Sequence, residues 1–269
     1  MGIRFYKYQG TGNDFIMIDD RSEVFETANL ALIQNLCDRK FGVGADGLIL
    51  IRNKYGYDFE MCYFNADGSQ SMCGNGARCA VAFSSFLGII SSHTGFFAID
   101  GPHKAKITGD WVELEMSPVK EVIKVEKDFY VDTGSPHHVK FVEDLNDYEV
   151  VEEGRSIRNQ KSRYPNGTNV NFVKSLAKDH IQVRTYERGV EDETLSCGTG
   201  VTACALVQGL IQNIESVKIS SLGGSLEVRF QKDETGGFHH IILAGPTKQV
   251  YAGNIGVDSL ETNPMKLSV

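Results

Sequence analysis

One short motif occurs twice in this chain and decides how the rest is interpreted. The first copy is Met72-Cys73-Gly74-Asn75-Gly76-Ala77-Arg78-Cys79-Ala80, and the second is Ser196-Cys197-Gly198-Thr199-Gly200-Val201-Thr202-Ala203-Cys204-Ala205. In both, a Cys-Gly-polar-Gly sequence leads into small and apolar residues, and a strand-like run that ends in polar residues comes before it. The pattern predicts a strand, a polar loop and then a helix that begins at the glycines.

A cysteine at the start of a helix has particular chemistry. The first turn exposes N–H groups without intrahelical partners and a partial positive charge, so an anion is favoured there. A thiol in such a position has a lowered pKa and a larger thiolate fraction. The glycines that follow allow a substrate carboxylate to approach the same N–H groups closely. One motif would suit a nucleophile, whereas Cys73 and Cys197 together indicate a pair.

A pair of thiols suits the inversion of a carbon centre. Inversion requires that a proton leaves one face of the carbon and that another returns to the opposite face. Two groups that face each other across the substrate, one a thiolate and one a thiol, can perform both steps. N–H groups on the substrate carboxylate would stabilise the carbanion-like transition state. Nothing in the sequence marks a pyridoxal or metal site, so a reaction without a cofactor is predicted.

Length and composition limit the remaining possibilities. A chain of 269 residues suits two domains, and the repeated motif favours two over one. An apolar content of 41% with 23% charged residues is typical of a globular protein. The net charge of −8 argues against nucleic acid as a partner, and no apolar run reaches the roughly 20 residues of a membrane helix. Without an apolar signal segment at the start, a cytoplasmic location is expected.

The order of the expected elements favours an α+β fold. Strand-like runs dominate both halves and each half has one principal helix, which argues against a βαβαβ Rossmann sheet. A further helix is expected over 27–40 with Thr27 as its N-cap, and a short helix near 151–159. We expect an N-terminal domain over 1–117 and a C-terminal domain over 118–246, joined by a crossing segment that runs to residue 127.

Three other interpretations fit parts of the sequence less well. The segment Gly42-Val43-Gly44-Ala45-Asp46-Gly47 matches the dinucleotide fingerprint, but it follows a helix and opens a strand, the reverse of the required context. The cysteines lack the two-residue spacing of zinc knuckles, and adjacent histidines on a strand point in different directions. A cysteine hydrolase could use His137 as its base, but it would leave the second motif unexplained.

Further polar candidates lie around the two motifs. Asn13, Asn65 and Asn169 are near turns, where asparagine is equally favoured for conformational reasons alone. Glu187 and Arg188 close the strand before the second motif; they could pair with each other, or Arg188 could bind a carboxylate while Glu187 tunes a thiol. The remaining cysteines fall inside helical or strand-like patterns and are expected to be core residues: Cys37, Cys62, Cys79 and Cys204.

Several of these segments together resemble the diaminopimelate epimerase family. The resemblance runs from residue 10 to about residue 252 and rests on Gly12-Asn13-Asp14-Phe15, Phe64-Asn65-Ala66-Asp67-Gly68, Cys73-Gly74-Asn75-Gly76, Pro136-His137, Tyr186-Glu187-Arg188-Gly189 and Cys197-Gly198-Thr199-Gly200. It implies two similar domains, each a curled, mostly antiparallel sheet around a central helix, with the active site between them. It also implies that a C-terminal strand near 247–258 returns to the first domain, although the segment 247–254 by itself could join either half.

The resemblance further implies a reaction and roles for the site residues. Such enzymes interconvert LL- and meso-diaminopimelate without a cofactor, on the path to lysine and peptidoglycan, and often as homodimers. Cys197 would take the proton from the LL isomer and Cys73 would return one, with His137 and Glu187 tuning the thiols. The distal amino acid end would contact Asn13, Asn65, Asn169 and Arg188, together with Glu187, and the α-carboxylate would contact the backbone of Gly74, Asn75, Gly198 and Thr199.

The sequence departs from the family pattern at a few places beside this expected site. Ser135 precedes Pro136-His137 where the family commonly has Asn, so a hydrogen bond is either lost or supplied by the serine hydroxyl. Gly47 replaces a Gln found in some members, and the loops before Cys73 and after Gly189 differ by one residue in length. Proline racemases share the cysteines but not the full set of segments; an amino acid racemase of that type is the alternative, ahead of a non-catalytic binding protein.

Overall fold

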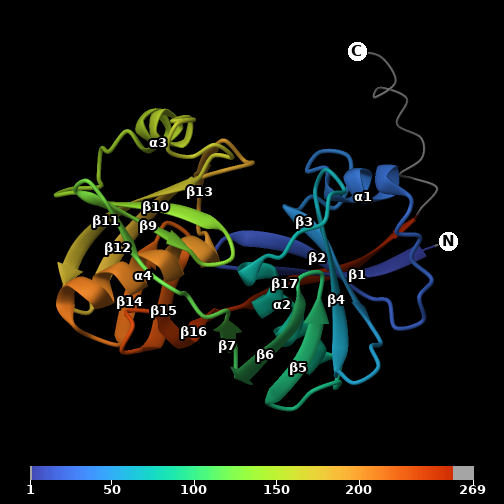
Figure 1. Ribbon diagram of the computed structural model, residues 1–269. Helices are drawn as coiled ribbons and strands as arrows, with labels where there is room; N and C mark the ends of the chain where they lie inside the picture. The colour runs from blue at the N-terminus through green and yellow to red at the C-terminus, as the bar shows by residue number, and fades with distance from the viewer. Residues whose placement is uncertain (1, 257–269) are drawn as a thin grey trace. The chain divides into compact units, whose positions relative to one another are not determined.

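The computed structural model describes residues 2–256 and shows many strands and few helices, which confirms the predicted α+β class (Figure 1). The chain forms two compact units. The first holds the described residues up to Val112 together with those from Thr247 onward, and the second spans Glu113–Pro246. Within the described part of the chain, no helix is long and apolar enough to cross a bilayer.

The first unit is built on one sheet. Its strands are β1 (Gly2–Gly10), β2 (Asn13–Asp19), β3 (Gly47–Arg52), β4 (Phe59–Asn65), β5 (His93–Ala98), β6 (Gly101–Thr108) and β17 (Lys248–Gly256), and its helices are α1 (Leu30–Cys37) and α2 (Gly74–Phe86). From β1 to β6 the successive pairings are antiparallel, parallel, antiparallel, parallel and antiparallel. Strand β17 pairs with β1, also antiparallel.

The second unit is built in the same way. Its strands are β8 (Ile123–Val125), β9 (Asp128–Asp132), β10 (Pro136–Phe141), β11 (Asn169–Ala177), β12 (His180–Glu187), β13 (Asp192–Thr194), β14 (Ser216–Ser221), β15 (Gly224–Lys232) and β16 (Phe238–Pro246), and its helices are α3 (Val150–Arg158) and α4 (Gly198–Gln212). Through β9, β10, β11, β12, β14 and β15 the pairings are again antiparallel, parallel, antiparallel, parallel and antiparallel. Strand β8 pairs with β9, as β17 pairs with β1.

This repetition places His137, Asn169, Glu187 and Asn65 at comparable positions of the two units. In the first unit Phe15 lies opposite Gly47, and Gly47 lies opposite Asn65. In the second unit His137 lies opposite Asn169, and Glu187 follows the Val170–Tyr186 pair on the next strand. The repeated cysteine motif therefore belongs to the repetition of a whole folding unit, in which α2 follows β4, and α4 follows β12 after the short strand β13.

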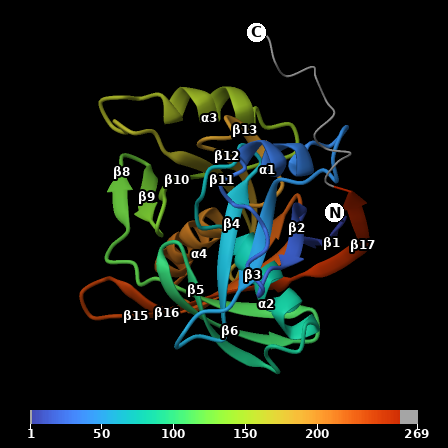
Figure 2. The same ribbon diagram turned by 90° about the vertical axis from the view of Figure 1, so that its right-hand side faces the viewer.

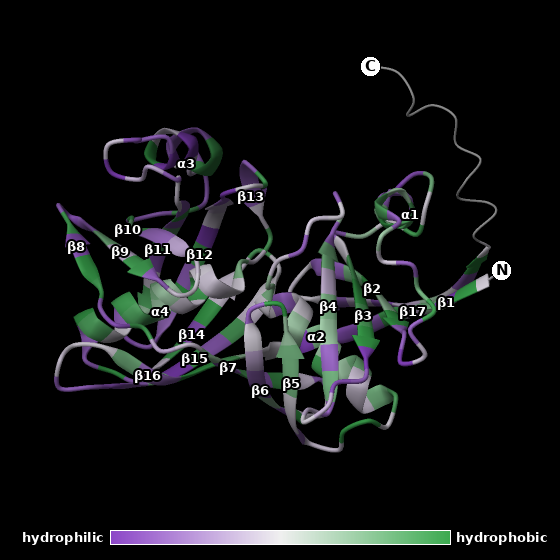
Figure 3. Cartoon of the chain, turned by 45° about the vertical axis from the view of Figure 1, so that its right-hand side comes forward, coloured by the Kyte–Doolittle hydropathy of each residue, from purple (hydrophilic) through white to green (hydrophobic). Residues whose placement is uncertain are grey.

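The two cysteine helices are central helices. Helix α4 is buried from Gly200 to Gly209, and its apolar side chains join a core with strand residues such as Val183, Ile219 and Leu243. Helix α2 contacts β1, β2, β3, β4 and β6, among them the apolar strand β3 (Figure 3). A helix that is buried on all sides is fixed by packing. The N-terminal end of each helix, with its cysteine, is therefore held firmly by its own unit.

Two local predictions are wrong. Helix α1 begins at Leu30, and its N-cap is Asn29, whose side-chain oxygen accepts the N–H of Leu32 at 3.0 Å. Thr27 lies in the preceding turn; asparagine is at least as good a cap as threonine, so the sequence did not discriminate between them. The segment from 117 to 127 is not only a crossing, because it contains β8, which forms a hairpin with β9 (Figure 2).

The C-terminal strand returns to the first unit as the resemblance implied. Strand β17 pairs with β1 from Gly256 opposite Gly2 to Lys248 opposite Gln9. Residues 257 and 258 of the expected strand lie outside the described residues. The compact units change over between Val112 and Glu113, inside strand β7 (Trp111–Met116), and the domain boundary after residue 117 stays a prediction.

Candidate active site

Cys73 and Cys197 are the N-cap residues of α2 and α4, as the sequence predicts. Both have extended backbone, with φ of −135° and −114°. The carbonyl of Cys73 accepts the N–H of Ala77 at 2.8 Å, and that of Cys197 accepts the N–H of Val201 at 2.9 Å. The Sγ of Cys73 also accepts the N–H of Gly76 at 3.5 Å. Each thiol thus lies at the positive end of a helix, where a thiolate is favoured.

Of the other four cysteines, Cys37, Cys79 and Cys204 are buried core residues, as predicted, whereas Cys62 is only partly buried. Burial raises the pKa of Cys37 to about 12 and that of Cys62 to about 11. Burial also raises the pKa of Cys79 and Cys204, which are fully enclosed in α2 and α4, far above the usual value for a thiol. These four side chains stay protonated at neutral pH, which leaves Cys73 and Cys197 as the candidates for acid/base chemistry.

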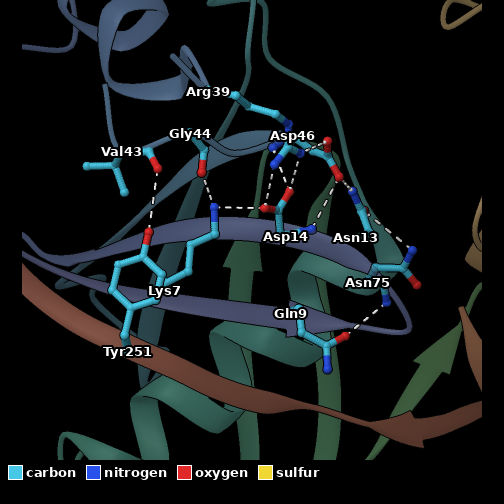
Figure 4. A network of polar contacts seen from close by, with 11 residues as sticks. Lys7, Gln9, Asn13, Asp14, Arg39, Val43, Gly44, Asp46, Asn75 and Tyr251 are labelled. Carbon is cyan, nitrogen blue, oxygen red and sulfur yellow. Dashed lines mark hydrogen bonds and ion pairs between the residues drawn. The ribbon is translucent and has the colours of Figure 1, made fainter. Parts of the chain in front are cut away.

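Asn13 connects Cys73 to the first sheet. Its Oδ1 lies 3.5 Å from the Sγ of Cys73 and accepts from the Nδ2 of Asn75 at 3.4 Å (Figure 4). Its Nδ2 donates to the carboxylate of Asp46 at 2.6 Å. Because the carboxylate must face the amide N–H group, the amide is oriented with its oxygen toward the thiol. Asn13, Cys73 and Asn75 are therefore brought together as the resemblance implied.

A tight turn places Asn13 there. Strands β1 and β2 are joined by Thr11 and Gly12 alone, with Gly10 opposite Asn13. Both turn residues have positive φ, 50° and 85°, as the type I′ hairpin requires. Threonine is an unusual residue at such a φ because it is β-branched. A hydrogen bond of 3.2 Å from the buried guanidinium of Arg78 to its hydroxyl holds it in place.

An ion network lies behind Asn13 (Figure 4). Arg39 binds both oxygens of Asp14 at 2.9 and 2.7 Å and reaches Asp46 at 2.7 Å. Lys7 pairs with Asp14 at 2.8 Å and donates to the carbonyl of Gly44. Burial would raise the pKa of Asp14, but the hydrogen bonds from Arg39 and Lys7 outweigh it and hold that pKa well below its usual range. The network fixes the carboxylate that orients Asn13.

Asn65 organises the loop before the first cysteine. Its Oδ1 accepts from the hydroxyl of Tyr63 at 2.8 Å, and its Nδ2 donates to the hydroxyls of Ser69 at 3.0 Å and Ser71 at 3.2 Å. These contacts support the interpretation that Asn65 stabilises the conformation of the loop. They bind the end of β4 to the segment that leads into Cys73 two residues after Ser71.

In the second unit, Thr199 lies between His137 and Cys197. The Nε2 of His137 is 2.9 Å from the hydroxyl oxygen of Thr199, and that oxygen is 3.5 Å from the Sγ of Cys197. The hydroxyl of Thr133 donates to the carbonyl of Thr199 at 3.0 Å and fixes its backbone. His137, Thr199 and Cys197 are therefore assembled within one unit, by β10 and the first turn of α4.

Asn171 determines which nitrogen of His137 carries the proton. Its Nδ2 donates to the carbonyl of His138 at 3.0 Å, and its Oδ1 accepts from the hydroxyl of Thr185 at 3.0 Å. This orientation directs the same Nδ2 at the Nδ1 of His137, 3.1 Å away. Nδ1 is then an acceptor, so the proton of a neutral ring is on Nε2 and is donated to Thr199. The threonine hydroxyl is left to donate toward the Sγ of Cys197.

The His137 ring is held neutral. Burial, with a smaller contribution from the positive charge of Arg188, lowers its pKa to about 3. A neutral imidazole cannot stabilise a thiolate by its charge. It acts on Cys197 through the hydrogen-bond chain from Asn171 to Thr199, which supports the predicted tuning role and gives it a specific form.

Asn169, Arg188 and Glu187 lie together at the ends of β11 and β12. Asn169 is almost fully buried; its Oδ1 accepts the N–H of Arg188 at 2.9 Å, and its Nδ2 donates to the carbonyl of Pro136 at 3.0 Å. The Ser135 hydroxyl lies 3.5 Å from the same Nδ2, so it supplies a weak contact where the family commonly has Asn. The carboxylate of Glu187 accepts from the hydroxyl of Thr194 at 2.9 Å.

Comparison with known proteins identifies the family of this chain. The family model described as diaminopimelate epimerase matches residues 5–117 and 129–248. A diaminopimelate epimerase from Flavobacterium psychrophilum is 49% identical, over 94% of this chain and 100% of the relative. Those from Chlorobaculum tepidum and Aquifex aeolicus are 42% and 39% identical, over 91% and 96% of this chain and 98% and 100% of the relatives. The chain belongs to the diaminopimelate epimerase family.

Solved structures of other proteins share the fold of this epimerase family member. A phenazine biosynthesis protein of the PhzF family from Bacillus anthracis has a TM-score of 0.75 at 13% identity, and covers 95% of this chain and 99% of its own. A hydroxyproline epimerase from Agrobacterium vitis has a TM-score of 0.71 at 16% identity, and covers 98% of this chain and 94% of its own. At these identities the likeness shows the fold alone.

Several residues that support the site were not predicted from the sequence of this epimerase family member. Asn171 and Thr185 orient His137, and Asp46 orients Asn13. Asn171 could have been suspected, since residues i and i+2 lie on the same face of a strand and Asn169 was already a candidate. Nothing in the sequence indicated the contacts of Asp46, because they depend on how the loop after α1 folds.

Proposed function

We propose that this protein interconverts LL- and meso-diaminopimelate by proton transfer between two cysteines and the substrate α-carbon, without a cofactor. The observation that carries the proposal is the matched placement of Cys73 and Cys197. Each is the N-cap of the central helix of one of two repeated units, and each has a polar contact that suits a thiol near a reacting centre. Membership of the diaminopimelate epimerase family supports the choice of substrate.

In the proposed reaction the two thiols exchange roles with each turnover. In the direction from LL to meso, the thiolate of Cys197 takes the α-proton and becomes a thiol, and the electron pair of the C–H bond remains on the α-carbon and its carboxylate. The thiol of Cys73 then gives its proton to the opposite face and becomes the thiolate. The reverse reaction uses the same steps in the opposite order, so the enzyme regains its starting state.

The carboxylate next to the reacting carbon is proposed to bind at the helix N-termini. The N–H groups of Gly74 and Asn75, and those of Gly198 and Thr199, belong to first turns, which direct N–H groups out of the helix. A carboxylate that gains negative charge as the proton leaves is stabilised there. A closed site that excludes water would strengthen this effect.

The remaining predicted residues are proposed to tune the thiols or to read the distal end of the substrate. His137 acts on Cys197 through Thr199, a role that the hydrogen-bond chain supports. Glu187 is proposed to tune a thiol or to contact substrate. Arg188 would bind the distal carboxylate by charge-assisted hydrogen bonds. Asn13, Asn65 and Asn169 would contact the same end of the substrate or hold the residues around it in position. For Asn65 and Asn169, whose amides already bond within the protein, a positioning role is favoured.

We also propose that the protein works in the cytoplasm as a homodimer, in the synthesis of lysine and peptidoglycan precursors. The family resemblance supports this proposal. Light scattering after size-exclusion chromatography tests the dimer, and a mass of one 29.7 kDa chain would contradict it.

Proton NMR in D₂O tests the function. Purified, reduced protein is added to LL-diaminopimelate without a cofactor, and the α-proton signal is followed. Loss of that signal together with appearance of the meso isomer is the expected result, and the Cys73→Ala variant serves as the matched blank. No change with diaminopimelate, together with exchange of the α-proton of L-proline in a parallel sample, would favour the racemase alternative and contradict the proposal.

A further inference from the structure

His138 is a buried histidine that the proposed reaction does not use. It follows His137 on β10, and successive residues of a strand point to opposite faces of the sheet. His137 reaches Thr199, whereas the Nδ1 of His138 lies 2.8 Å from the hydroxyl oxygen of Tyr164. The Nε2 of His138 lies 3.1 Å from a carboxylate oxygen of Asp128, at the start of β9. Both ring nitrogens of this enclosed histidine, which is 1% exposed, therefore have a partner within the second unit.

The partners of His138 determine the direction of both hydrogen bonds. A carboxylate can only accept, so Nε2 carries a proton and donates it to Asp128. Burial lowers the pKa of His138 in spite of the opposing effect of Asp128, so the ring is neutral and Nδ1 is an acceptor. Burial raises the pKa of Tyr164 to about 12, so its hydroxyl is protonated and donates to Nδ1. Two directed hydrogen bonds thus run from Tyr164 through His138 to Asp128.

Tyr164 belongs to the loop that connects α3 to β11, residues 159–168, which we call the Tyr164 loop. From residue 159 to residue 166, a stretch that the structure describes in full, Tyr164 is the one buried residue. Its ring lies in an apolar cluster with Phe172 of β11 and Tyr186 of β12. The side chain of Tyr164 therefore fastens an otherwise exposed part of the loop to the sheet.

The backbone of Tyr164 takes part in two consecutive turns. Its N–H donates to the carbonyl of Gln160 at 2.8 Å, and its carbonyl accepts the N–H of Gly167 at 2.9 Å. The second turn contains Asn166, which is exposed. The position of the Asn166 carbonyl therefore depends on where Tyr164 is held.

An exposed ion pair is the other polar contact of this loop with β8 and β9. It joins Arg163 to Glu126, in the turn between those strands. Ion pairs between exposed side chains contribute little, because water and salt screen them. The buried hydrogen bond from Tyr164 to His138 is therefore the stronger polar anchor of the two.

The second turn of the loop supports the side chain of Arg188. The Nη1 of Arg188 donates to the carbonyl of Asn166 at 3.2 Å. The side chain also passes close to Gly167, where an added Cβ would lie 3.4 Å from the Cδ of Arg188. The backbone of Arg188 is held separately, by the Oδ1 of Asn169, which accepts its N–H at 2.9 Å. The Tyr164 loop thus places the guanidinium, while β11 places the backbone that carries it.

We propose that His138 and Tyr164 are positioning residues, whose hydrogen bond anchors the Tyr164 loop so that the Asn166 carbonyl holds the guanidinium of Arg188 ready for the distal carboxylate of the substrate. The inference rests on the proposed function for the role of Arg188. Loss of the anchor leaves the two cysteines and the His137–Thr199 contact untouched, since these depend on β10 and α4. The anchor therefore acts on substrate binding and not on proton transfer.

The test compares two tyrosine variants that lose the same group. Tyr164→Phe removes the hydroxyl and keeps the ring. Tyr148→Phe is the matched control, because Tyr148 packs against the same apolar cluster and its hydroxyl donates to Glu153 of α3 at 2.5 Å. Asp128→Ala removes the acceptor of the His138 ring, and Asp128→Asn keeps one. Hydrogen exchange followed by mass spectrometry reports on residues 159–168 without substrate, and steady-state kinetics with LL-diaminopimelate gives kcat and KM.

In Tyr164→Phe we expect hydrogen exchange in the Tyr164 loop to become faster by about fivefold or more, because a buried hydrogen bond has been lost. The KM for LL-diaminopimelate should rise by about fivefold or more while kcat changes by less than about twofold, as when binding common to the ground state and the transition state is lost. Asp128→Ala should act in the same direction. Asp128→Asn and Tyr148→Phe should stay close to the wild type in both measurements.

Three results would overturn the proposal. Unchanged hydrogen exchange in Tyr164→Phe would show that the hydroxyl does not anchor the loop. Faster exchange with an unchanged KM would show that the loop does not position Arg188. A fall in kcat at constant KM, or equal effects in Tyr148→Phe, would indicate a general structural role.

Two further provisions keep these outcomes decisive. If Tyr164→Phe does not fold, Asp128→Ala, at a partly exposed position, gives the same comparison against Asp128→Asn. A wild-type protein that does not epimerise LL-diaminopimelate would refute the proposed function, and hydrogen exchange in the variants would still decide whether Tyr164 anchors the loop.

Discussion

At the scale of single residues, position separates Cys73 and Cys197, the two proposed acid/base groups, from the other four cysteines. None of the six forms a disulfide within the described residues. Cys79 lies only six residues after Cys73 on the same helix, yet burial keeps it protonated, whereas Cys73 lies at the N-cap beside the amide oxygen of Asn13. The chemistry assigned to Cys73 and Cys197 therefore depends on the helix start, which the glycines of the motif mark in the sequence.

Replacement of either functional cysteine should abolish turnover and spare the fold. We expect Cys73→Ala and Cys197→Ala to lower the rate of epimerisation by at least about 10²–10⁴-fold, because each removes one of two acid/base groups. Thermal unfolding should change little, since neither thiol fills the core in the way that Cys79 does. Cys62→Ala, which removes a partly buried thiol from β4, is the control and should keep its activity. Near-normal turnover in either helix-mouth variant would contradict the two-base account.

The neutral state of His137 should appear in the pH dependence of stability. Its pKa is about 3 in the folded protein, against roughly 6.5 in an unfolded chain. Between these values the unfolded state binds more protons, so the stability that this group contributes is complete above pH 6.5 and is lost as the pH falls. From pH 6 to 5 the wild type should lose about 1.4 kcal/mol more than His137→Gln, measured by urea unfolding. Equal losses would show that the ring is not held neutral.

The sequence allowed the site residues to be named but not their contacts. The cysteines and Thr199 could be predicted because they lie in the repeated motif, and His137 because Pro136-His137 is one of the segments that carry the family resemblance. The roles of Asn171 and Asp46 could not, because one depends on the pairing of β10 with β11 and the other on the loop that follows α1. The sequence likewise did not show that Asn29, and not Thr27, caps α1, because the side chains of both residues can accept a hydrogen bond at a helix start.

At the scale of elements, close packing on the helix starts places the site. A Cβ at Gly200 would lie 2.4 Å from the Oδ1 of Asn171, which is closer than Cβ atoms come to such an atom, and a tight 3.3 Å from the ring of His137. At the matching position in α2, a Cβ on Gly76 would meet the end of Ile49 at 3.1 Å, and that side chain can move. The second motif is thus more tightly fitted than the first.

This difference predicts unequal effects of the same substitution. Gly200→Ala should push Asn171 away from His137 and lower activity strongly, with a loss of stability of about 1–3 kcal/mol as in other overpacked cores. Gly76→Ala should cost less in both respects, because Ile49 can adjust. Denaturant unfolding and epimerisation rates of the two variants give the comparison. A larger effect at Gly76 than at Gly200 would contradict this description of the two helix starts.

Most helices and strands could be predicted from periodicity, since the central helices are long and the core strands are apolar. The exceptions are the three-residue strands β8 and β13, which are too short to show a period. The alternation of parallel and antiparallel pairing could not be predicted either. It depends on connections such as the one through α2 between β4 and β5, whose handedness and length the local pattern does not express.

At the scale of the whole molecule, the repetition of one folding unit accounts for the two acid/base groups of the proposed mechanism. Each unit provides one central helix and one cysteine at its start. The units are alike in strand pairing but differ inside the helices, where the fully buried residue five positions after the cysteine is Arg78 in α2 and Thr202 in α4. A reaction that must address both faces of a carbon needs two such groups, which a single unit cannot supply.

If the two cysteines face one substrate, mild oxidation should join them. We expect a weak oxidant such as diamide to inactivate the enzyme, with one disulfide between the peptides that carry Cys73 and Cys197, and dithiothreitol to restore activity. Substrate or a substrate analogue should protect against the reaction. Inactivation that reductant does not reverse, or a disulfide that involves Cys62 in place of either one, would count against a shared site.

The most direct test of the central claim is the position of deuterium early in the reaction in D₂O. With LL-diaminopimelate as substrate, the two-base mechanism delivers a solvent deuteron from Cys73 to the new face, while Cys197 holds the abstracted proton. We therefore expect the first meso product to carry deuterium at the inverted carbon and the remaining LL substrate to carry almost none, as followed by mass spectrometry and NMR below about 10% conversion. Equal labelling of substrate and product at that stage would mean that one base serves both faces, and would contradict the account.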